Sequence, residues 1–183
     1  MSPVIHAELS WLAAQALPER RDRRLVLLAG IAPDLDGLSI LAGVESYGRW
    51  HHALTHGIVA ALVVTALCGL AARRRMATAL LAFAAFHLHL LCDLAGSGLG
   101  WSIAYLWPWS RREWMWSGAW ELNAWPNLVI GAVVAVACFA TALPLGRTIV
   151  EVFSPRFDRL VVETLRRRFG WSRTAARGRA PGE

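Results

Sequence analysis

The sequence predicts an all-α integral membrane protein, a bundle of four to five helical segments followed by a C-terminal amphipathic helix. Of its 183 residues, 56% are hydrophobic and only 17% are charged, whereas soluble domains are about 25% charged. The apolar residues form long uncharged runs, and the 19 basic residues, all of them Arg, fall between those runs. Nucleic-acid binding needs a solvated basic surface, so we expect no nucleic acid and instead membrane lipids as partners.

Five apolar segments differ in how well they fit a membrane span. The run 25–44 is interrupted by Pro33-Asp34-Leu35-Asp36, and the run 3–17 is short, so it either spans the membrane or lies in its interface. About 20 apolar residues cross a bilayer core. The strongest candidates are uncharged over 16 to 19 residues, with neutral histidines: 57–72, 76–92 and 128–146.

The arginines predict the topology. Sixteen of the 19 lie in three clusters, at 20–24, at 73–75 and from Arg147 onward. By the positive-inside rule these clusters share the cytoplasmic face of a multi-pass protein. The six His then belong to the opposite, outer side.

The chain is expected to comprise a membrane-embedded domain over 1–147 and a cytoplasmic basic helix and tail over 148–183. A basic amphipathic helix lies on the membrane surface or packs on the protein's own cytoplasmic end. Its apolar stripe consists of Phe157, Leu160, Val161, Thr164, Leu165 and Phe169. The Gly-rich segment 96–125 holds seven of the ten Trp and is expected to be a loop or a broken helix on the outer side. Those Trp form an interfacial belt or a wall around a lipid headgroup.

Ionisable side chains inside apolar segments are costly, so each needs a physical reason. Imidazoles and carboxylates are the ligand types of zinc and similar divalent metals. At 1.5 Å per helical residue, candidates from four segments lie about 15–27 Å from the Arg clusters. This shared depth predicts one metal site in the outer half of the bilayer. The candidate ligands are His6, Asp34, Asp36, His51, His56, His89 and Asp93.

His89 and Asp93 form the strongest pair of candidates. They are four residues apart in an apolar helical run, so they differ by only about 40° around the helix axis. They either supply half of a metal site or form a hydrogen-bonded pair between helices. His87 points about 200° away from His89 and is expected either to support a ligand from behind or to be structural, and not to be a ligand itself.

Asp34 and Asp36 follow Pro33, which interrupts the helix. A broken helix at membrane depth is tolerated where it faces protein or a wet cavity, which favours a site over a surface turn at Asp36-Gly37. Whichever of the two carboxylates is not a metal ligand is the candidate catalytic base.

The segment from His51 to His56 leaves one ligand undecided. His52 and His56 share a face if a helix begins before residue 51. If the helix begins near Thr55, as a Thr cap allows, His51 lies in the preceding loop. The sequence therefore leaves open whether His51 or His52 is the ligand.

These motifs together carry a family resemblance over about residues 1–112. The motifs are His6, Ala32-Pro33-Asp34-Leu35-Asp36, His51 through Thr55-His56, and His89-x-x-x-Asp93 followed by Leu106-Trp107-Pro108. Together they resemble the motifs of the bacterial inner-membrane metal-dependent hydrolases. The motifs of that family are similar to His-Arg-Gly-x-Thr-His and His-x-x-x-Asp. His51 and His56 match the two His positions, with His52-Ala53 where Arg-Gly is usual.

The order of the candidate ligands is also similar to that of secreted zinc-dependent phospholipases C. That likeness implies one or two zinc ions, with Asp93 able to bridge two. It also implies metal ligation by His6, Asp34 or Asp36, His51 or His56, and His89. The His-x-x-x-Glu pair of those enzymes does not occur in this chain.

The sequence therefore suggests a hydrolase of the bacterial inner membrane with its site on the periplasmic side. It would act through a metal-activated water on a small-molecule or lipid phosphoester such as a phospholipid headgroup. Trp107, Glu121 and Asn123 are candidates for substrate binding. The alternatives are a metal or proton transporter and a non-catalytic scaffold with a structural metal.

Overall fold

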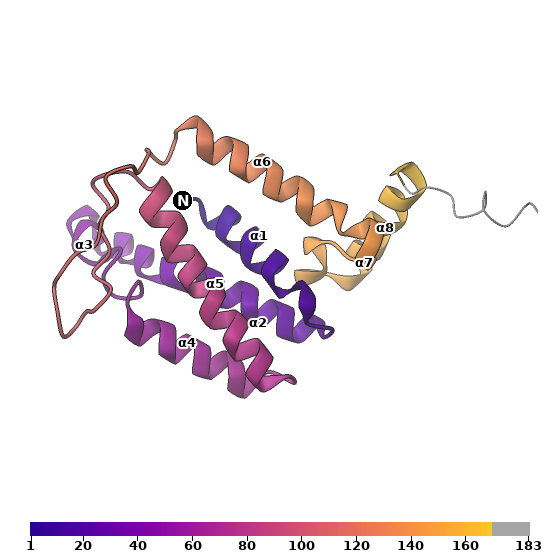
Figure 1. Cartoon of the computed structure of the whole chain (residues 1–183), viewed down its shortest axis with the longest axis horizontal. Coiled ribbons are helices and arrows are strands. Elements are labelled where there is room, and N and C mark those ends of the chain that lie inside the picture. The colour runs from indigo at the N-terminus through magenta and orange to yellow at the C-terminus, as the bar shows by residue number, and fades with distance from the viewer. Residues whose placement is uncertain (170–183) are drawn as a thin grey trace, which may run out of the picture. The chain divides into compact units, whose positions relative to one another are not determined.

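The computed structural model describes residues 1–169, whose regular elements are all helices. The cytoplasmic tail predicted beyond Phe169 lies outside the described residues. The chain divides into an N-terminal unit, Met1–Val136, and a C-terminal unit, Ala137–Glu183, and each is described by itself. The helices, coloured along the chain in Figure 1, are α1 (Pro3–Ala13), η1 (Ala14–Ala16), α2 (Arg20–Ile31), η2 (Ala32–Ala42), α3 (Val44–Trp50), α4 (Ile58–Ala71), α5 (Arg75–Gly96), α6 (Trp125–Ala140), α7 (Ala142–Leu145), η3 (Ile149–Val152) and α8 (Pro155–Phe169).

Three helical stretches are long and apolar enough to cross a membrane: Arg20–Ala42, Arg75–Gly96 and Trp125–Leu145. The predicted all-α membrane bundle is confirmed. Two segments differ from expectation. The interrupted run 25–44 belongs to a long span because the 3₁₀ helix η2 continues α2 through Pro33. The run 57–72 is shortened to the 14 residues of α4, because residues 51–57 form turns instead of helix.

In the N-terminal unit, α5 packs on α1, α2 and α4, and α1 packs on α2 (Figure 1). Small residues such as Ala29 and Ala82 line the contact between α2 and α5, which lets the helices approach closely. Gly30 allows the same approach between α1 and α2, since a Cβ at this position would lie 1.7 Å from Ser10 Oγ. These close contacts hold α1, α2 and α5 together.

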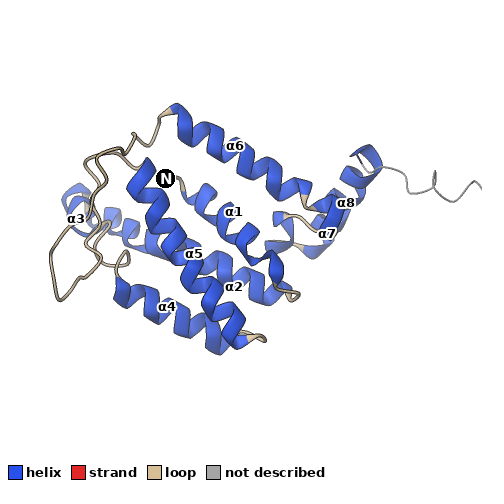
Figure 2. Ribbon diagram, viewed as in Figure 1, coloured by secondary structure: helices blue, strands red, loops and turns tan. Residues whose placement is uncertain are grey.

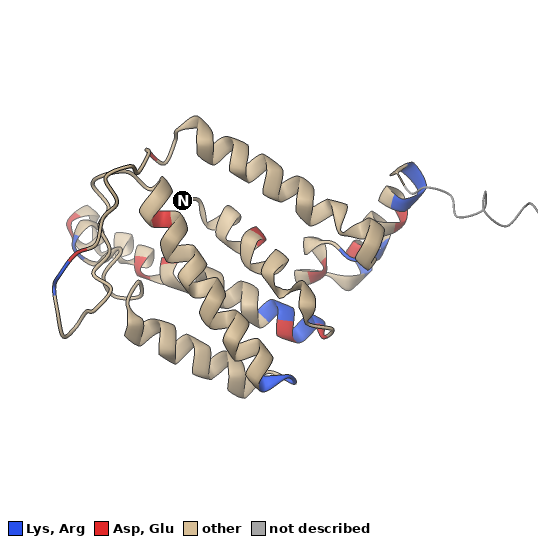
Figure 3. Ribbon diagram, viewed as in Figure 1, with Lys and Arg blue, Asp and Glu red and all other residues tan. Residues whose placement is uncertain are grey.

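The two Arg clusters of the N-terminal unit lie at one end of it (Figure 3). Asp22 near the start of α2 is buried and accepts the backbone N–H groups of Arg73 and Arg74, at 2.9 Å each. This carboxylate joins the start of α2 to the turn before α5. The sequence clusters at 20–24 and 73–75 are therefore neighbours, as a shared face requires.

Irregular chain covers the other end of the same unit, where Figure 2 shows the long loops. Residues 97–124 contain no helix, so of the two alternatives for the Gly-rich segment, a loop or a broken helix, the structure has the loop. Backbone hydrogen bonds attach this loop to the turn before α4: Ala104 N–H donates to His52 O, and Ile58 N–H donates to Tyr105 O. Asn127 Nδ2 donates to the carbonyls of Gly96 and Leu122 at 2.8 and 2.7 Å, which ties the loop ends to α6.

The C-terminal unit consists of the end of α6, α7, η3 and α8. The inner side of α8 packs on α7 and η3. Thr148 donates from both its backbone N and its Oγ1 to the buried Asp158 carboxylate, at 2.8 and 2.6 Å. One face of the amphipathic helix therefore packs within this unit.

Replacing Asp22 by Ala is expected to destabilise the N-terminal unit by about 1–3 kcal/mol, because two part-buried hydrogen bonds from backbone N–H groups to a carboxylate are lost. The exposed ion pair between Glu19 and Arg73 is the matched control, and Glu19→Ala is expected to cost less than about 1 kcal/mol. Thermal unfolding of both variants in detergent measures the difference. Equal melting temperatures for the two variants would contradict the role given to Asp22.

Candidate metal centre

Four side chains converge from three parts of the N-terminal unit. His89 and Asp93 come from α5, Asp34 from η2 and His56 from the turn before α4. Each offers one ligand atom, and these four atoms all lie within 4.8 Å of one another. His56, His89 and Asp93 are buried, whereas Asp34 is partly exposed. The convergence predicted from depth along the helices is present in the structure.

His89 is held in the orientation that a metal ligand needs. Its Nδ1 lies 2.7 Å from the carbonyl oxygen of Gly30, so Nδ1 carries the proton and donates it. Nε2 then presents its lone pair to the cluster, 2.9 Å from Asp93 Oδ2 and 3.7 Å from Asp34 Oδ1. A backbone carbonyl that fixes the tautomer of a histidine is a common second partner of metal-binding imidazoles. The predicted shared face of His89 and Asp93 is confirmed.

Asp36 orients two imidazoles at once. Its Oδ2 lies 2.9 Å from His56 Nδ1, and its Oδ1 lies 2.7 Å from His51 Nδ1. Asp36 is in turn held by Thr55, whose backbone N–H donates to Oδ2 and whose Oγ1 accepts the Asp36 N–H. His56 is left with Nε2 toward the cluster, 3.5 Å from Asp93 Oδ2.

His6 reaches the cluster from α1. Its Nε2 lies 3.1 Å from Asp93 Oδ1, and its ring stacks on that of His89 with the centroids 3.7 Å apart. The close approach of α1 to α2 at Gly30 makes this stacking possible. Asp93 also contacts the Met1 amine and Ser97 Oγ, so its two oxygens face a crowded ring of polar atoms.

The donor set fits a divalent metal ion. His56 Nε2, His89 Nε2 and Asp34 Oδ2 are buried atoms that have no hydrogen-bond partner among the described residues. Leaving buried polar atoms without a partner is costly, and a cation between them would satisfy them together. Two imidazole nitrogens with carboxylate oxygens are typical zinc ligands.

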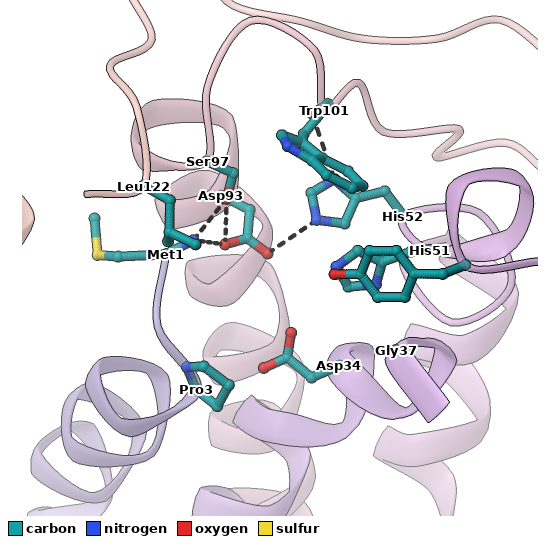
Figure 4. Close-up of a pocket in the computed structure, with 11 residues that line it drawn as sticks. Met1, Pro3, Asp34, Gly37, His51, His52, Asp93, Ser97, Trp101 and Leu122 are labelled. Carbon is teal, nitrogen blue, oxygen red and sulfur yellow. Dashed lines mark hydrogen bonds and ion pairs between the residues drawn. The ribbon is translucent and has the colours of Figure 1, made fainter. Parts of the chain in front are cut away.

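A cavity of about 340 Å³ opens beside the cluster (Figure 4). Asp34 and Asp93 point into it from opposite sides, and the rings of His52 and Trp101 cover one edge. Met1, Pro3 and Leu122 form an apolar part of its lining. The cluster is therefore closed by protein on the side of His56 and His89 and accessible on the side of Asp34.

The sequence profile of the YdjM inner membrane protein family matches residues 1–157. The chain belongs to this family. No curated protein and no solved structure shows a significant match to it. The residues matched include the whole His and Asp cluster, so the centre lies within the part of the chain that defines a YdjM family member. Membership makes the chain a bacterial inner-membrane protein.

His52 of this YdjM family member has an unusual backbone. Its φ of 67° lies in the left-handed region, which non-glycine residues seldom adopt. The buried ring comes within 3.7 Å of Asp93 Oδ2 through Nε2. Burial and the neighbouring His56 lower the pKa of His52 to about 3, so this imidazole is neutral. His51 and His52 are both adjacent to the cavity, and neither belongs to the four-atom cluster.

The structure does not bring the three predicted substrate-binding residues to this cavity. Trp107, Glu121 and Asn123 are absent from its lining, where Trp101 and Leu122 stand instead. Glu121 lies against Gly98, and Asn123 is exposed. A role for these residues stays a prediction.

Sequence reasoning missed several supporting residues and correctly set one aside. Gly30, Thr55 and Trp101 hold or cover the site, and of these only Thr55, inside the motif, carried a sequence signal. The expectation that His87 is not a ligand itself is confirmed, because its two nitrogens lie 2.8 Å from Phe83 O and 2.9 Å from Tyr105 Oη, away from the cluster.

Zinc binding is expected to release a proton from His56. Burial lowers the pKa of this imidazole, but its hydrogen bond to Asp36 and the negative charges of Asp36 and Asp93 outweigh burial and raise the pKa to about 9. Below pH 9 the metal must displace that proton, so affinity falls by about tenfold per pH unit as the pH is lowered. Titration calorimetry at pH 7 and pH 8, in buffers of different ionisation enthalpy, measures both quantities. His56→Gln should release one proton fewer, and a dissociation constant independent of pH would contradict the assignment.

Proposed function

We propose that this protein is a metal-dependent hydrolase of the bacterial inner membrane that acts on a phosphoester. One observation carries the proposal: the unpartnered buried atoms of His56, His89 and Asp34 face one point beside an open cavity. A structural metal site is closed on all sides, whereas a catalytic site keeps one position open. The accessible side at Asp34 supports the catalytic alternative.

Asp34, His56, His89 and Asp93 would hold the ion, and zinc suits this donor set. One bound ion would satisfy the atoms that lack partners. In the two-ion alternative, His6, which lies on the other oxygen of Asp93, would help to hold the second ion. When bound, the ion lowers the pKa of water toward neutrality and offsets negative charge on a phosphoryl oxygen.

His51 is proposed as the residue that moves the proton. Asp36 occupies its Nδ1, which orients the ring and leaves Nε2 for the cavity that His51 lines. A carboxylate behind an imidazole is the usual arrangement for a general base. His51 Nε2 takes the proton of the attacking water and returns it to the leaving oxygen. Asp36 therefore serves as the orienting carboxylate, in place of the base expected from the sequence.

The cavity suits a phosphoester that is part of an amphiphile. Asp34, Asp93 and Ser97 form its polar side, while Met1, Pro3, Leu122 and Trp101 form an apolar side. A second cavity of about 230 Å³ shares His51, His52 and Trp101 with the first and is bordered by Arg49 and Glu113. A polar leaving group would fit this second cavity. A phospholipid suits the two cavities together, because it has a polar headgroup and an apolar part.

The proposed orientation follows from charge. Asp22 joins the Arg segments 20–24 and 73–75, and α5 runs from Arg75 at this end of the unit to Asp93, which lines the cavity, near its other end. By the positive-inside rule, this multi-pass protein then places the cavity at the periplasmic surface.

His89→Ala is expected to abolish zinc binding and to lower phosphoester hydrolysis at least 100-fold, because it removes an oriented ligand. His87→Ala is the matched control, two residues away on the same helix and outside the cluster. Zinc content by elemental analysis and hydrolysis of a lipid phosphoester, with and without chelator, measure both. Retained zinc in His89→Ala would contradict the site, and zinc binding without hydrolysis of any lipid or small phosphoester would favour a structural metal.

His51→Ala is expected to retain zinc and to lower kcat by about 100-fold or more, because the proton carrier is lost. The loss should be greater for alkyl phosphoesters than for p-nitrophenyl esters, whose leaving groups need no proton. Steady-state kinetics on the two substrate types test this difference. Loss of zinc from His51→Ala would instead make His51 a ligand, and equal losses on both substrates would contradict the proton transfer.

A further inference from the structure

In the C-terminal unit, Phe153, just before α8, and one face of α8 itself are apolar and exposed. The exposed fractions of Phe153, Phe157 and Leu160 are 85%, 64% and 54%. The opposite side of the helix is engaged within the unit, because Asp158 and Val162 are buried and Arg166 donates to the carbonyls of Ala142 and Leu143. The packing of α8 therefore uses one stripe and leaves a second apolar stripe uncovered among the described residues.

Arginines border this uncovered stripe. At 100° per residue, Arg156, Arg167 and Arg168 fall on the same side of α8 as Phe157 and Leu160, within an arc of about 120°. All three are exposed. Apolar side chains between long basic ones suit the boundary of a bilayer, where the rings enter the acyl region and the guanidinium groups stay among the phosphates.

The chain reaches α8 soon after a membrane span. The apolar stretch Trp125–Leu145 ends ten residues before Pro155, where α8 begins. Basic residues this close to a span lie within reach of the anionic headgroups of the same leaflet. A second copy of the same face would place Arg against Arg, which disfavours self-association through it.

We propose that α8 docks on anionic phospholipid headgroups through Phe153, Phe157 and Leu160, with Arg156, Arg167 and Arg168 binding the phosphates. The C-terminal unit is then a lipid-binding module separate from the metal centre. It recognises the negative charge of the leaflet and needs no hydrolysis of the lipid.

Nitroxide labels on the full-length protein in lipid nanodiscs test this proposal. Labels at Phe157→Cys and, as matched control on the polar border of α8, at Glu163→Cys are compared after the three native cysteines are replaced by Ser. With 30% phosphatidylglycerol, the label at 157 should become accessible to oxygen and protected from a water-soluble nickel reagent, whereas the label at 163 should stay accessible to nickel. A triple change of Arg156, Arg167 and Arg168 to Gln should lower the ratio of docked to undocked helix by about 100-fold.

Three results would overturn the proposal. Full accessibility of the label at 157 to nickel in phosphatidylglycerol would show that no lipid covers the face. Protection from both reagents would show that protein covers it. Equal protection in pure phosphatidylcholine would remove the requirement for anionic lipid. Because no residue of α8 belongs to the metal centre, zinc content and hydrolysis of the triple variant report separately on the proposed enzyme.

Discussion

The carboxylate of Asp93 is the group on which the rest of the N-terminal unit depends. Its side chain is 2% exposed. His6 lies 3.1 Å from one of its oxygens, and His56 and His89 lie 3.5 and 2.9 Å from the other. A buried carboxylate is tolerated only with compensating positive charge, which a metal ion held between Asp93 and the imidazoles would supply, so helices from distant parts of the chain converge on this point. Packing serves that requirement: the absence of a side chain at Gly30 lets α1 approach α2 and stack His6 on His89.

Asp36 links the cluster around Asp93 to the cavity beside it. One carboxylate holds the ring of His56, which faces the cluster, and that of His51, which lines the cavity. A regular α-helix would carry Asp34 and Asp36 about 200° apart, on opposite sides. The 3₁₀ geometry that begins at Ala32 changes this angle, so Asp34 joins the cluster while Asp36 binds the imidazoles beside it. The break at Pro33 is therefore part of the site.

The sequence predicted the parts of the site whose positions follow from the regular geometry of α-helices. The shared face of His89 and Asp93 follows from helical spacing, whereas depth relative to the arginines gave Asp34 and Asp36 alike as candidates, together with His6 and His56. The choice between His51 and His52 could not be predicted, because it depends on a left-handed φ at His52 and on which ring Asp36 accepts. Trp101, and not Trp107, covers the cavity for a similar reason: residues 97–124 have no period from which a direction can be inferred.

Helix α4 is short because the turn that carries the imidazoles of the site takes the place of its first part. A helix of 14 residues rises about 21 Å, less than the bilayer core of about 30 Å. The missing length is the turn that carries His51, His52 and His56 to the depth of Asp93. Irregular backbone at that depth is stable only when protein satisfies its polar groups. Here Ala104 N–H donates to the carbonyl of His52, and the Tyr105 carbonyl accepts the N–H of Ile58. The Gly- and Trp-rich loop therefore supplies the hydrogen bonds that allow a turn carrying three imidazoles to stand where α4 would otherwise continue.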